Sequence, residues 1–268
     1  MRDPNPAVRG KGIAQLRRAG LSVTVGTARK EAEMLNRAYS HWIVTKRPYV
    51  TLKAGMTLDG QIATSGGESK WITGLRSRQD VHRLRSAVDA VIVGIGTVLK
   101  DNPSLTARKS PGLTALAATQ PIRIVVDSAL RIFPAADILT QQSRAKTIIA
   151  TTQSASPARR RALERRGIEV LQLPSRGGRV SLKHLLAVLG QRGVTSAMVE
   201  GGGELNAAFF KAKLVNHVRL YVAPTLLGGA ASKGVIGGTG PRRLADAWKL
   251  KQVCTRILGS DVVVEGDV

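Results

Sequence analysis

Charged residues follow two expected strands of this sequence. Lys53 ends the apolar run 49–53, and Glu200 ends the run 196–200, where it is followed at once by three glycines (201–203). A lysine ammonium at such a place can meet a polar substrate, and a carboxylate can accept hydrogen bonds from the N–H groups of a heterocycle. Glycines ahead of a helix leave backbone N–H groups free at the positive end of its dipole, which favours an anion. A surface lysine before a turn is the plainer interpretation of Lys53.

Two more strand ends carry residues that suit a phosphorylated ligand. Gly94 and Gly96 close one expected strand and let a ligand approach the backbone. Ser128 and Arg131 follow another strand, and a hydroxyl with a guanidinium can bind a phosphate monoester. Tight strand-to-helix packing and a solvated arginine are the competing interpretations. The glycines at 201–203 do not form a dinucleotide-binding fingerprint, because Asn206 stands at the position of its third glycine.

Strands and helices are expected to alternate from residue 48 onward, and their order positions these side chains. The expected strands are 49–53, 90–95, 122–127, 147–150, 196–200, 218–222 and a C-terminal pair around Arg256 and Val262. The expected helices are 77–87, 157–166, 181–191 and 204–211. This alternation predicts an α/β fold with a largely parallel central sheet whose ligands lie at the carboxyl ends of the strands.

The first 46 residues are expected to form a separate small segment. The pattern predicts a helix over 12–19, strand-like alternation over 21–25 and a helix over 28–45 that stops before Pro48. A segment of this size cannot enclose its own core, so it must pack on something else. We therefore divide the chain into residues 1–46 and 47–268.

Composition narrows the function classes. The 268 residues hold 41 Lys and Arg against 18 Asp and Glu, a formal charge of +23 that attracts phosphates on nucleic acid, membrane or small substrate. The basic residues are dispersed, and the three Phe, three Tyr and three Trp do not interleave with them, which weighs against a base-stacking platform. One cysteine and four scattered histidines predict no metal site. No apolar run is long enough to cross a membrane and no secretory signal is visible, so we expect a cytoplasmic protein.

Five motifs, which occur in a fixed order, give the sequence a specific resemblance to a known family. They are Pro48 to Lys53, Thr57-Leu58-Asp59-Gly60, Gly67 to Thr73, Asp101 to Arg108, and Val199-Glu200-Gly201-Gly202. In these the chain, over residues 48–268, resembles the reductase domain of bacterial bifunctional riboflavin biosynthesis proteins, the pyrimidine deaminase/reductase family. The resemblance implies a dihydrofolate-reductase-like three-layer fold and a homodimer. It also implies reduction of 5-amino-6-(5-phosphoribosylamino)uracil by NADPH, with hydride passing to ribose C1′.

The resemblance also assigns roles to residues. Its substrate contacts fall on Ser69, Arg85, Leu105, Arg108 and Glu200, with Lys53 nearby, and Lys53 and Glu200 are the expected catalytic residues. Its cofactor contacts fall on Gly55, Trp71, Thr97, Asp101, Ser128, Gly202, Gly203, Glu204, Leu205, Asn206, Ala207 and Ala208. Arg85 and Arg108 suit bidentate pairing with the substrate phosphate, and Glu200 suits the uracil N–H edge. No dedicated general acid is evident, so we expect Lys53 or water to supply the proton.

Residues 1–46 resemble the C-terminal tail of the family's deaminase domain. The chain has neither a His-x-Glu motif nor paired cysteines, so the zinc-bound hydroxide of a deaminase cannot form and we expect no deaminase activity. Two explanations for the missing zinc half stay open. The chain is a truncated bifunctional enzyme, or its partner deaminase is a separate protein. Two other functions also stay open: a reductase of the same fold acting on another pyrimidine or pterin, and a basic nucleic-acid-binding protein.

Overall fold

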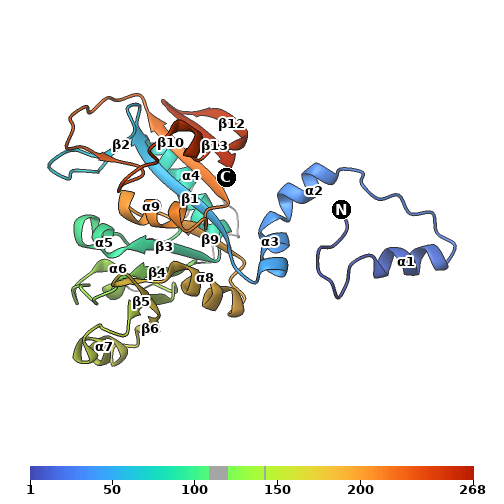
Figure 1. Cartoon of the computed structure of the whole chain (residues 1–268), viewed down its shortest axis with the longest axis horizontal. Coiled ribbons are helices and arrows are strands. Elements are labelled where there is room, and N and C mark those ends of the chain that lie inside the picture. The colour runs from blue at the N-terminus through green and yellow to red at the C-terminus, as the bar shows by residue number, and fades with distance from the viewer. Residues whose placement is uncertain (109–119, 142) are drawn as a thin grey trace. The chain divides into compact units, whose positions relative to one another are not determined.

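The computed structural model describes residues 1–108, 120–141 and 143–268 (Figure 1). The chain divides into two compact units. The smaller unit comprises Met1–Tyr49 with Leu186–Ser196, and the larger comprises Val50–Leu185 with Ala197–Val268. The division into domains at residue 46 stays a prediction.

A nine-stranded sheet with the order β12-β13-β10-β1-β9-β3-β4-β5-β6 forms the centre of the larger unit. Its strands are β1 (Tyr49–Thr57), β3 (Ala90–Gly94), β4 (Ile122–Val126), β5 (Thr147–Thr152), β6 (Glu169–Leu173), β9 (Ser196–Val199), β10 (His217–Ala223), β12 (Lys251–Leu258) and β13 (Asp261–Asp267). Two small two-stranded sheets pair β2 (Gln61–Ala63) with β11 (Lys233–Gly234) and β7 (Ser175–Arg176) with β8 (Arg179–Val180).

Most of the strand pairs are parallel. β3 pairs in parallel with both β4 and β9, β4 with β5, β5 with β6, and β1 with β10. The C-terminal hairpin of β12 and β13 joins β10 in antiparallel pairing. The predicted α/β fold with a mostly parallel central sheet is confirmed.

Helices connect the strands of the sheet. They are α4 (Leu75–Ala87), α5 (Ile95–Asp101), α6 (Asp137–Thr140), α7 (Pro157–Glu164), α8 (Leu182–Gln191) and α9 (Gly203–Lys211), with a 3₁₀ turn at Leu244–Asp246. A side-chain cap marks the start of α7. The Ser156 hydroxyl accepts a hydrogen bond from the Arg159 amide, and Pro157 occupies the first turn of α7.

Both faces of the central strands are buried. Val91 and Val93 of β3 join a cluster with Val125 of β4 and Val98 of α5. Ile92, which points to the opposite face, is also fully buried. A strand buried on both faces has a continuous apolar sequence, which is why residues 90–93 contain no polar side chain.

Several elements of the larger unit differ from the sequence-based predictions, among them β1, β6 and α5. β1 does not end at Lys53 but continues to Thr57, so the lysine lies in mid-strand. The edge strand β6 was not predicted, because its pattern of half-buried side chains follows no clear alternation. The short helix α5 was not predicted either, since seven residues give too few turns for a visible period.

The smaller unit contains α1 (Lys11–Arg18), α2 (Arg29–Leu35) and α3 (Arg37–Thr45), and none of their residues is buried. The strand predicted over 21–25 is wrong, because this stretch has neither strand structure nor a partner strand among the described residues. The helix predicted over 28–45 is interrupted at Asn36, whose side-chain amide donates to the Ala32 carbonyl and ends α2.

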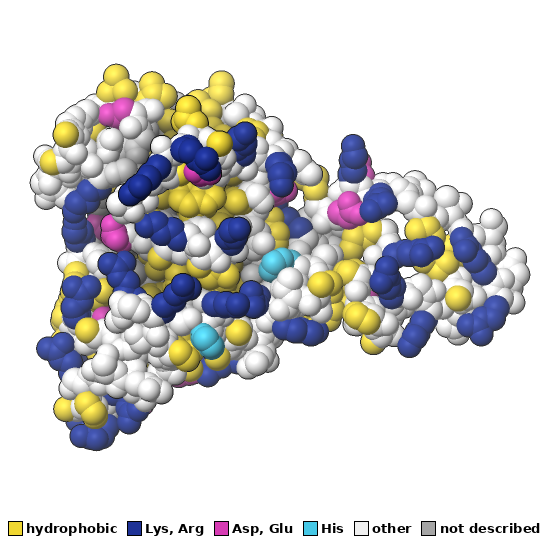
Figure 2. Space-filling model, in the orientation of Figure 1, with side chains coloured by type: hydrophobic (Ala, Val, Ile, Leu, Met, Phe, Trp, Pro, Cys, Tyr) yellow, Lys and Arg dark blue, Asp and Glu magenta, His cyan; other side chains and the backbone are white. Residues whose placement is uncertain are grey.

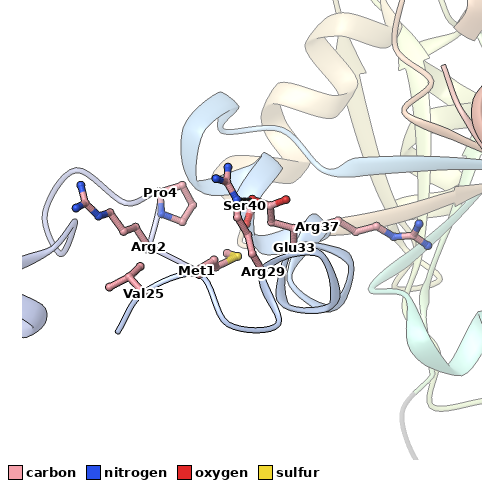
Figure 3. A pocket seen from close by; sticks show the side chains of 9 residues that line it. Met1, Arg2, Pro4, Val25, Arg29, Glu33, Arg37 and Ser40 are labelled. Carbon is pink, nitrogen blue, oxygen red and sulfur yellow. Dashed lines mark hydrogen bonds and ion pairs between the residues drawn. The ribbon is translucent and has the colours of Figure 1, made fainter. Parts of the chain in front are cut away.

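One close contact orders the smaller unit. Trp42 Nε1 of α3 donates to the Gly190 carbonyl at 2.8 Å. A Cβ on Gly190 would lie 2.1 Å from the Lys46 carbonyl oxygen, so only glycine fits there. A cavity of about 660 Å³ opens beside α2 and α3 and is lined by Met1, Val25, Arg29 and Arg37 among others (Figure 3).

Basic side chains are spread over the face of the molecule drawn in Figure 2. Figure 2 shows Lys and Arg scattered across the visible face rather than gathered in one patch, with few Asp and Glu between them. Among the described residues, no helix has the length and apolar character needed to cross a membrane.

Candidate active site

Three charged side chains from separate elements meet in the larger unit. Arg85 of α4 forms two bonds to Glu200, which directly follows β9: Nε to Oε1 at 2.7 Å and Nη2 to Oε2 at 3.0 Å. Lys53 Nζ of β1 lies 3.5 Å from Glu200 Oε2. The three side chains are only 17%, 15% and 7% exposed for Lys53, Arg85 and Glu200, respectively. The backbone fixes the carboxylate, since the Glu200 amide donates to the Ile92 carbonyl at 3.0 Å.

Burial and charge act in opposite directions on this cluster. Burial would raise the pKa of Glu200, but the positive charges of Arg85 and Lys53 outweigh it and lower that pKa to about 2. Burial lowers the pKa of Lys53, which Glu200 partly restores. The site thus holds a permanent carboxylate between two cations, one of which gives up its proton more readily than a free lysine.

The structure shows protein partners of Arg85 that the sequence analysis did not identify. Two of its guanidinium nitrogens bind Glu200, and Nη1 donates to the Thr106 carbonyl at 3.2 Å. Three of its five N–H groups are thus engaged within the protein. Arg85 therefore holds Glu200, and its predicted phosphate contact stays a prediction.

Leu105 and Arg108 lie beside the cluster. Leu105 has a φ of 54° and its side chain is 3% exposed in the core, so it can offer a ligand only its backbone groups. Arg108 is exposed. Burial, helped by the positive charges of Arg85 and Arg108, lowers the pKa of His82, which places Arg108 near the same site.

Ser69 and Asp101 are in contact, and Trp71 follows Ser69 closely in the chain. Ser69 Oγ donates to Asp101 Oδ1 at 2.8 Å, and Lys70 Nζ donates to the Asp101 carbonyl at 2.6 Å. The Ser69–Asp101 bond therefore joins a predicted substrate residue to a predicted cofactor residue. Trp71 is 71% exposed, and the Arg78 guanidinium lies 4.6 Å from its ring centroid. An exposed aromatic face of this kind is available for stacking.

The predicted cofactor loop begins α9. No side chain caps this helix, so its first N–H groups are not satisfied by a cap at Gly202. A Cβ on Gly202 would meet nothing closer than Thr97 Oγ1 at 3.9 Å, which leaves room for a ligand and brings two predicted cofactor residues together. By contrast, a Cβ on Gly203 would lie 2.7 Å from the Gly234 carbonyl oxygen.

The later residues of that loop serve packing. Asn206 and Ala207 are 0% and 4% exposed, and Asn206 Nδ2 donates to the Val235 carbonyl at 2.9 Å. Leu205 packs against Gly201, where a Cβ would lie 2.8 Å from its Cδ2. Glu204 is exposed, and Ala208 is half-buried. The side chains of Asn206 and Ala207 are thus buried in the protein, and their predicted cofactor contacts stay predictions.

The remaining predicted cofactor residues lie on separate elements. Gly55 of β1 is packed against Thr73, since a Cβ there would lie 3.1 Å from Thr73 Cγ2. Ser128 follows β4, and its Oγ accepts a hydrogen bond from the Val180 amide at 3.1 Å. The Ser128 hydroxyl therefore already has a partner from β8.

Some residues near the cluster escaped the sequence analysis. The Lys53 ammonium lies 5.8 Å from the ring centroid of Tyr221, whose hydroxyl donates to Asp80 Oδ2 at 2.7 Å. His82 and Arg85 are three residues apart, which places them on one face of a helix, and that spacing could have drawn attention to His82. Tyr221 gave no comparable signal. Within the described parts of the chain, no group of three or more His, Cys, Asp or Glu side chains could hold a metal ion.

Comparison with known proteins places the chain in a family. Residues 48–264 match the family described as "RibD C-terminal domain". The "Riboflavin biosynthesis protein RibD" of Actinobacillus pleuropneumoniae is 41% identical over 263 residues, which are 98% of this chain and 68% of that protein.

Two solved structures are similar over the whole chain. RibD from Acinetobacter baumannii superposes with a TM-score of 0.85 at 31% identity, covering 100% of this chain and 71% of that one. A diaminohydroxyphosphoribosylaminopyrimidine deaminase/5-amino-6-(5-phosphoribosylamino)uracil reductase from Thermotoga maritima gives 0.79 at 30% identity, covering 100% and 69%. The chain therefore belongs to the RibD C-terminal domain family, the reductases of riboflavin biosynthesis.

Proposed function

We propose that the chain reduces 5-amino-6-(5-phosphoribosylamino)uracil to its ribitylamino product with NADPH as the hydride donor. The buried cluster of Lys53, Arg85 and Glu200 carries this proposal. A carboxylate kept ionised by two cations suits the N–H edge of a uracil, and a buried ammonium beside it suits the oxygen or nitrogen that is left when C1′ accepts hydride. The Thermotoga maritima relative is named as a reductase of this same compound, which further supports the choice of substrate.

NADPH fits the residues present. The uncapped start of α9 offers N–H groups to a pyrophosphate, and the open space at Gly202 lets it approach. The exposed ring of Trp71 offers a stacking face, and Thr97 lies close to Gly202. When bound there, the cofactor supplies the hydride for C1′.

The chain's own residues then position the substrate and move one proton. Glu200 accepts hydrogen bonds from the uracil and is itself held by Arg85. Lys53 donates a proton to the substrate as C1′ is reduced, and its lowered pKa makes that transfer easier. Arg108, which is exposed, is left to bind the substrate phosphate together with Ser69.

The proton step is tested with Lys53→Met. If Lys53 donates the proton, turnover falls by about 10²–10⁴-fold, the usual contribution of a positioned acid, while the Kd for NADPH stays the same. Lys233→Met, at an exposed lysine outside the cluster, is the control. Unchanged turnover in Lys53→Met would assign the proton to water.

The wider activity belongs to the same proposal. We propose that these 268 residues do not deaminate, because they contain one cysteine and no His-x-Glu motif. We further propose a cytoplasmic homodimer, supported by the exposed edge strand β12, and a separate deaminase as a candidate partner for residues 1–46. Light scattering of the purified chain, alone and mixed with a deaminase domain, tests both assemblies.

The first experiment is NADPH oxidation with the phosphoribosylaminouracil and, as control, with its precursor that still carries the amino group. Turnover of the first substrate alone supports the proposed reaction. Equal turnover of both would contradict the assigned substrate preference. A folded chain that binds NADPH but turns over neither would point to another reductase substrate.

A further inference from the structure

The recognition segment, residues 104–108, has no helix or strand structure, yet it contains Leu105 and Arg108. The positive φ of Leu105 turns its side chain into the core. Within the described part of the chain, neither backbone polar group of Leu105 makes a hydrogen bond. The segment therefore presents backbone groups and one guanidinium, and their placement depends on what holds it.

Helix α4 holds the middle of the recognition segment. The Thr106 carbonyl lies 3.2 Å from Arg85 Nη1 and 3.2 Å from His82 Nδ1. A carbonyl only accepts, so His82 must carry its proton on Nδ1. Two side chains from one helix face thus fix a single carbonyl, and one of them also binds Glu200.

Gln120 holds the next residue at two points. The Ala107 amide donates to Gln120 Oε1 at 2.9 Å, and Gln120 Nε2 donates to the Ala107 carbonyl at 2.8 Å. This two-point contact copies the pairing of a neighbouring strand and fixes the orientation of the Ala107 peptide groups, directly before Arg108.

Arg123 of β4 holds the start of the segment. It is 4% exposed, and its Nη1 donates to the Ser104 carbonyl at 3.2 Å while Nη2 donates to the Ala145 carbonyl at 3.0 Å. Its Nε has no partner among the described residues, and burial lowers its pKa. A buried guanidinium that binds only carbonyls is costly, so this position is poorly explained by stability alone.

We propose that His82, Gln120 and Arg123 are positioning residues for substrate recognition, which act by fixing the recognition segment so that the Leu105 backbone and the Arg108 guanidinium meet the substrate. This inference rests on the proposed function and deepens it. None of the three is assigned a ligand. Each of the three binds a different carbonyl of the recognition segment, so together they fix its backbone in one conformation.

Gln120→Ala and His82→Ala test the proposal, because Arg123 is too deeply buried for a clean variant. We expect the KM for the phosphorylated substrate to rise about five- to tenfold in each, as for the loss of one or two hydrogen bonds. The kcat and the Kd for NADPH should stay unchanged, since Lys53, Glu200 and α9 are intact. His82→Asn, whose amide can donate in place of Nδ1, should restore the KM.

The matched controls are Gln141→Ala and His184→Ala, which lose comparable bonds to Asp137 and Ser181 outside the segment. An unchanged KM in the test variants, or a rise shared by the controls, would overturn the inference. The inference would also be overturned if KM rose only in variants whose Tm falls and if His82→Asn did not restore it.

Failure of the proposed function is a separate outcome. It shows as a wild-type chain that does not turn over the phosphoribosylaminouracil. In that case the affinity for this compound, measured by calorimetry, replaces KM in the same comparison. The inference is contradicted if wild type and variants bind this compound with equal affinity. It is also contradicted if none of them binds the compound.

Discussion

At the scale of single residues, Glu200 is the group on which the site depends. It is almost fully buried and its two neighbours in the cluster, Arg85 and Lys53, are cations. A buried ion pair adds little to stability as a whole, but removing one partner leaves an uncompensated charge. The structural role of this carboxylate and its proposed chemical role can be separated by measurement.

Glu200→Gln removes the negative charge and keeps the shape. We expect it to destabilise the chain by about 3–5 kcal/mol, because Arg85 and Lys53 lose their buried counter-charge. Glu204→Gln, at an exposed glutamate, is the control and should leave stability unchanged. Urea unfolding measures both, and a difference of zero between the two variants would contradict the assigned role of Glu200.

The same change should move the pH dependence of turnover. Glu200 raises the pKa of Lys53, so its removal lowers that pKa further. A proton donor is active below its pKa, so the alkaline limb of kcat should shift to lower pH in Glu200→Gln. An alkaline limb at the same pH in both enzymes would exclude Lys53 as the titrating donor.

At the scale of elements, the sequence predicted the buried strands and missed what lies at the edges. The apolar run of β3 left no alternative, whereas β6 and α5 were too short or too mixed to show a period. The site followed the same rule. Glu200 was singled out because it directly follows a strand, and Lys53 because the sequence predicted a strand end there, although β1 continues to Thr57. That Arg85 faces Glu200 depends on how α4 packs, which no sequence spacing reveals.

The start of α9 offers a test at this scale. A methyl group on Gly203 would lie 2.7 Å from the Gly234 carbonyl oxygen, so Gly203→Ala must displace that backbone. We expect a loss of about 1–3 kcal/mol in stability and a raised Kd for NADPH. Gly12→Ala in α1, where a Cβ also meets nothing within 4 Å, is the control. Equal Kd values for NADPH in the two variants would argue against a cofactor site at this helix end.

At the scale of the whole molecule, acid stability follows from the buried carboxylates. The pKa of Glu200 falls to about 2 from an ordinary value of 4.5, and that of Glu265 also falls to about 2. A lowered folded-state pKa contributes stability above pH 4.5 that is lost as pH falls toward 2. We expect most of the stability that Glu200 and Glu265 contribute to be lost between pH 4.5 and pH 2. Circular dichroism at a series of pH values measures this loss. Glu265→Gln should make the loss less steep, and an unchanged slope would contradict this.

The dispersed charge of +23 gives a second prediction at this scale. We expect non-specific binding to nucleic acid at low salt that weakens steeply as salt is raised, because it depends on counterion release alone. Fluorescence anisotropy with two unrelated oligonucleotides should give equal affinities. Sequence-selective binding at physiological salt would instead support a nucleic-acid-binding function.

The Ser69–Asp101 hydrogen bond links two assignments that were made separately. A substrate that takes over the Ser69 hydroxyl frees Asp101 Oδ1, and a cofactor that takes over Asp101 frees Ser69. Each ligand therefore frees a group that the other ligand binds. Linkage requires that each ligand raises the affinity for the other by the same factor. The two ligands should bind cooperatively, and Ser69→Ala should make their binding independent.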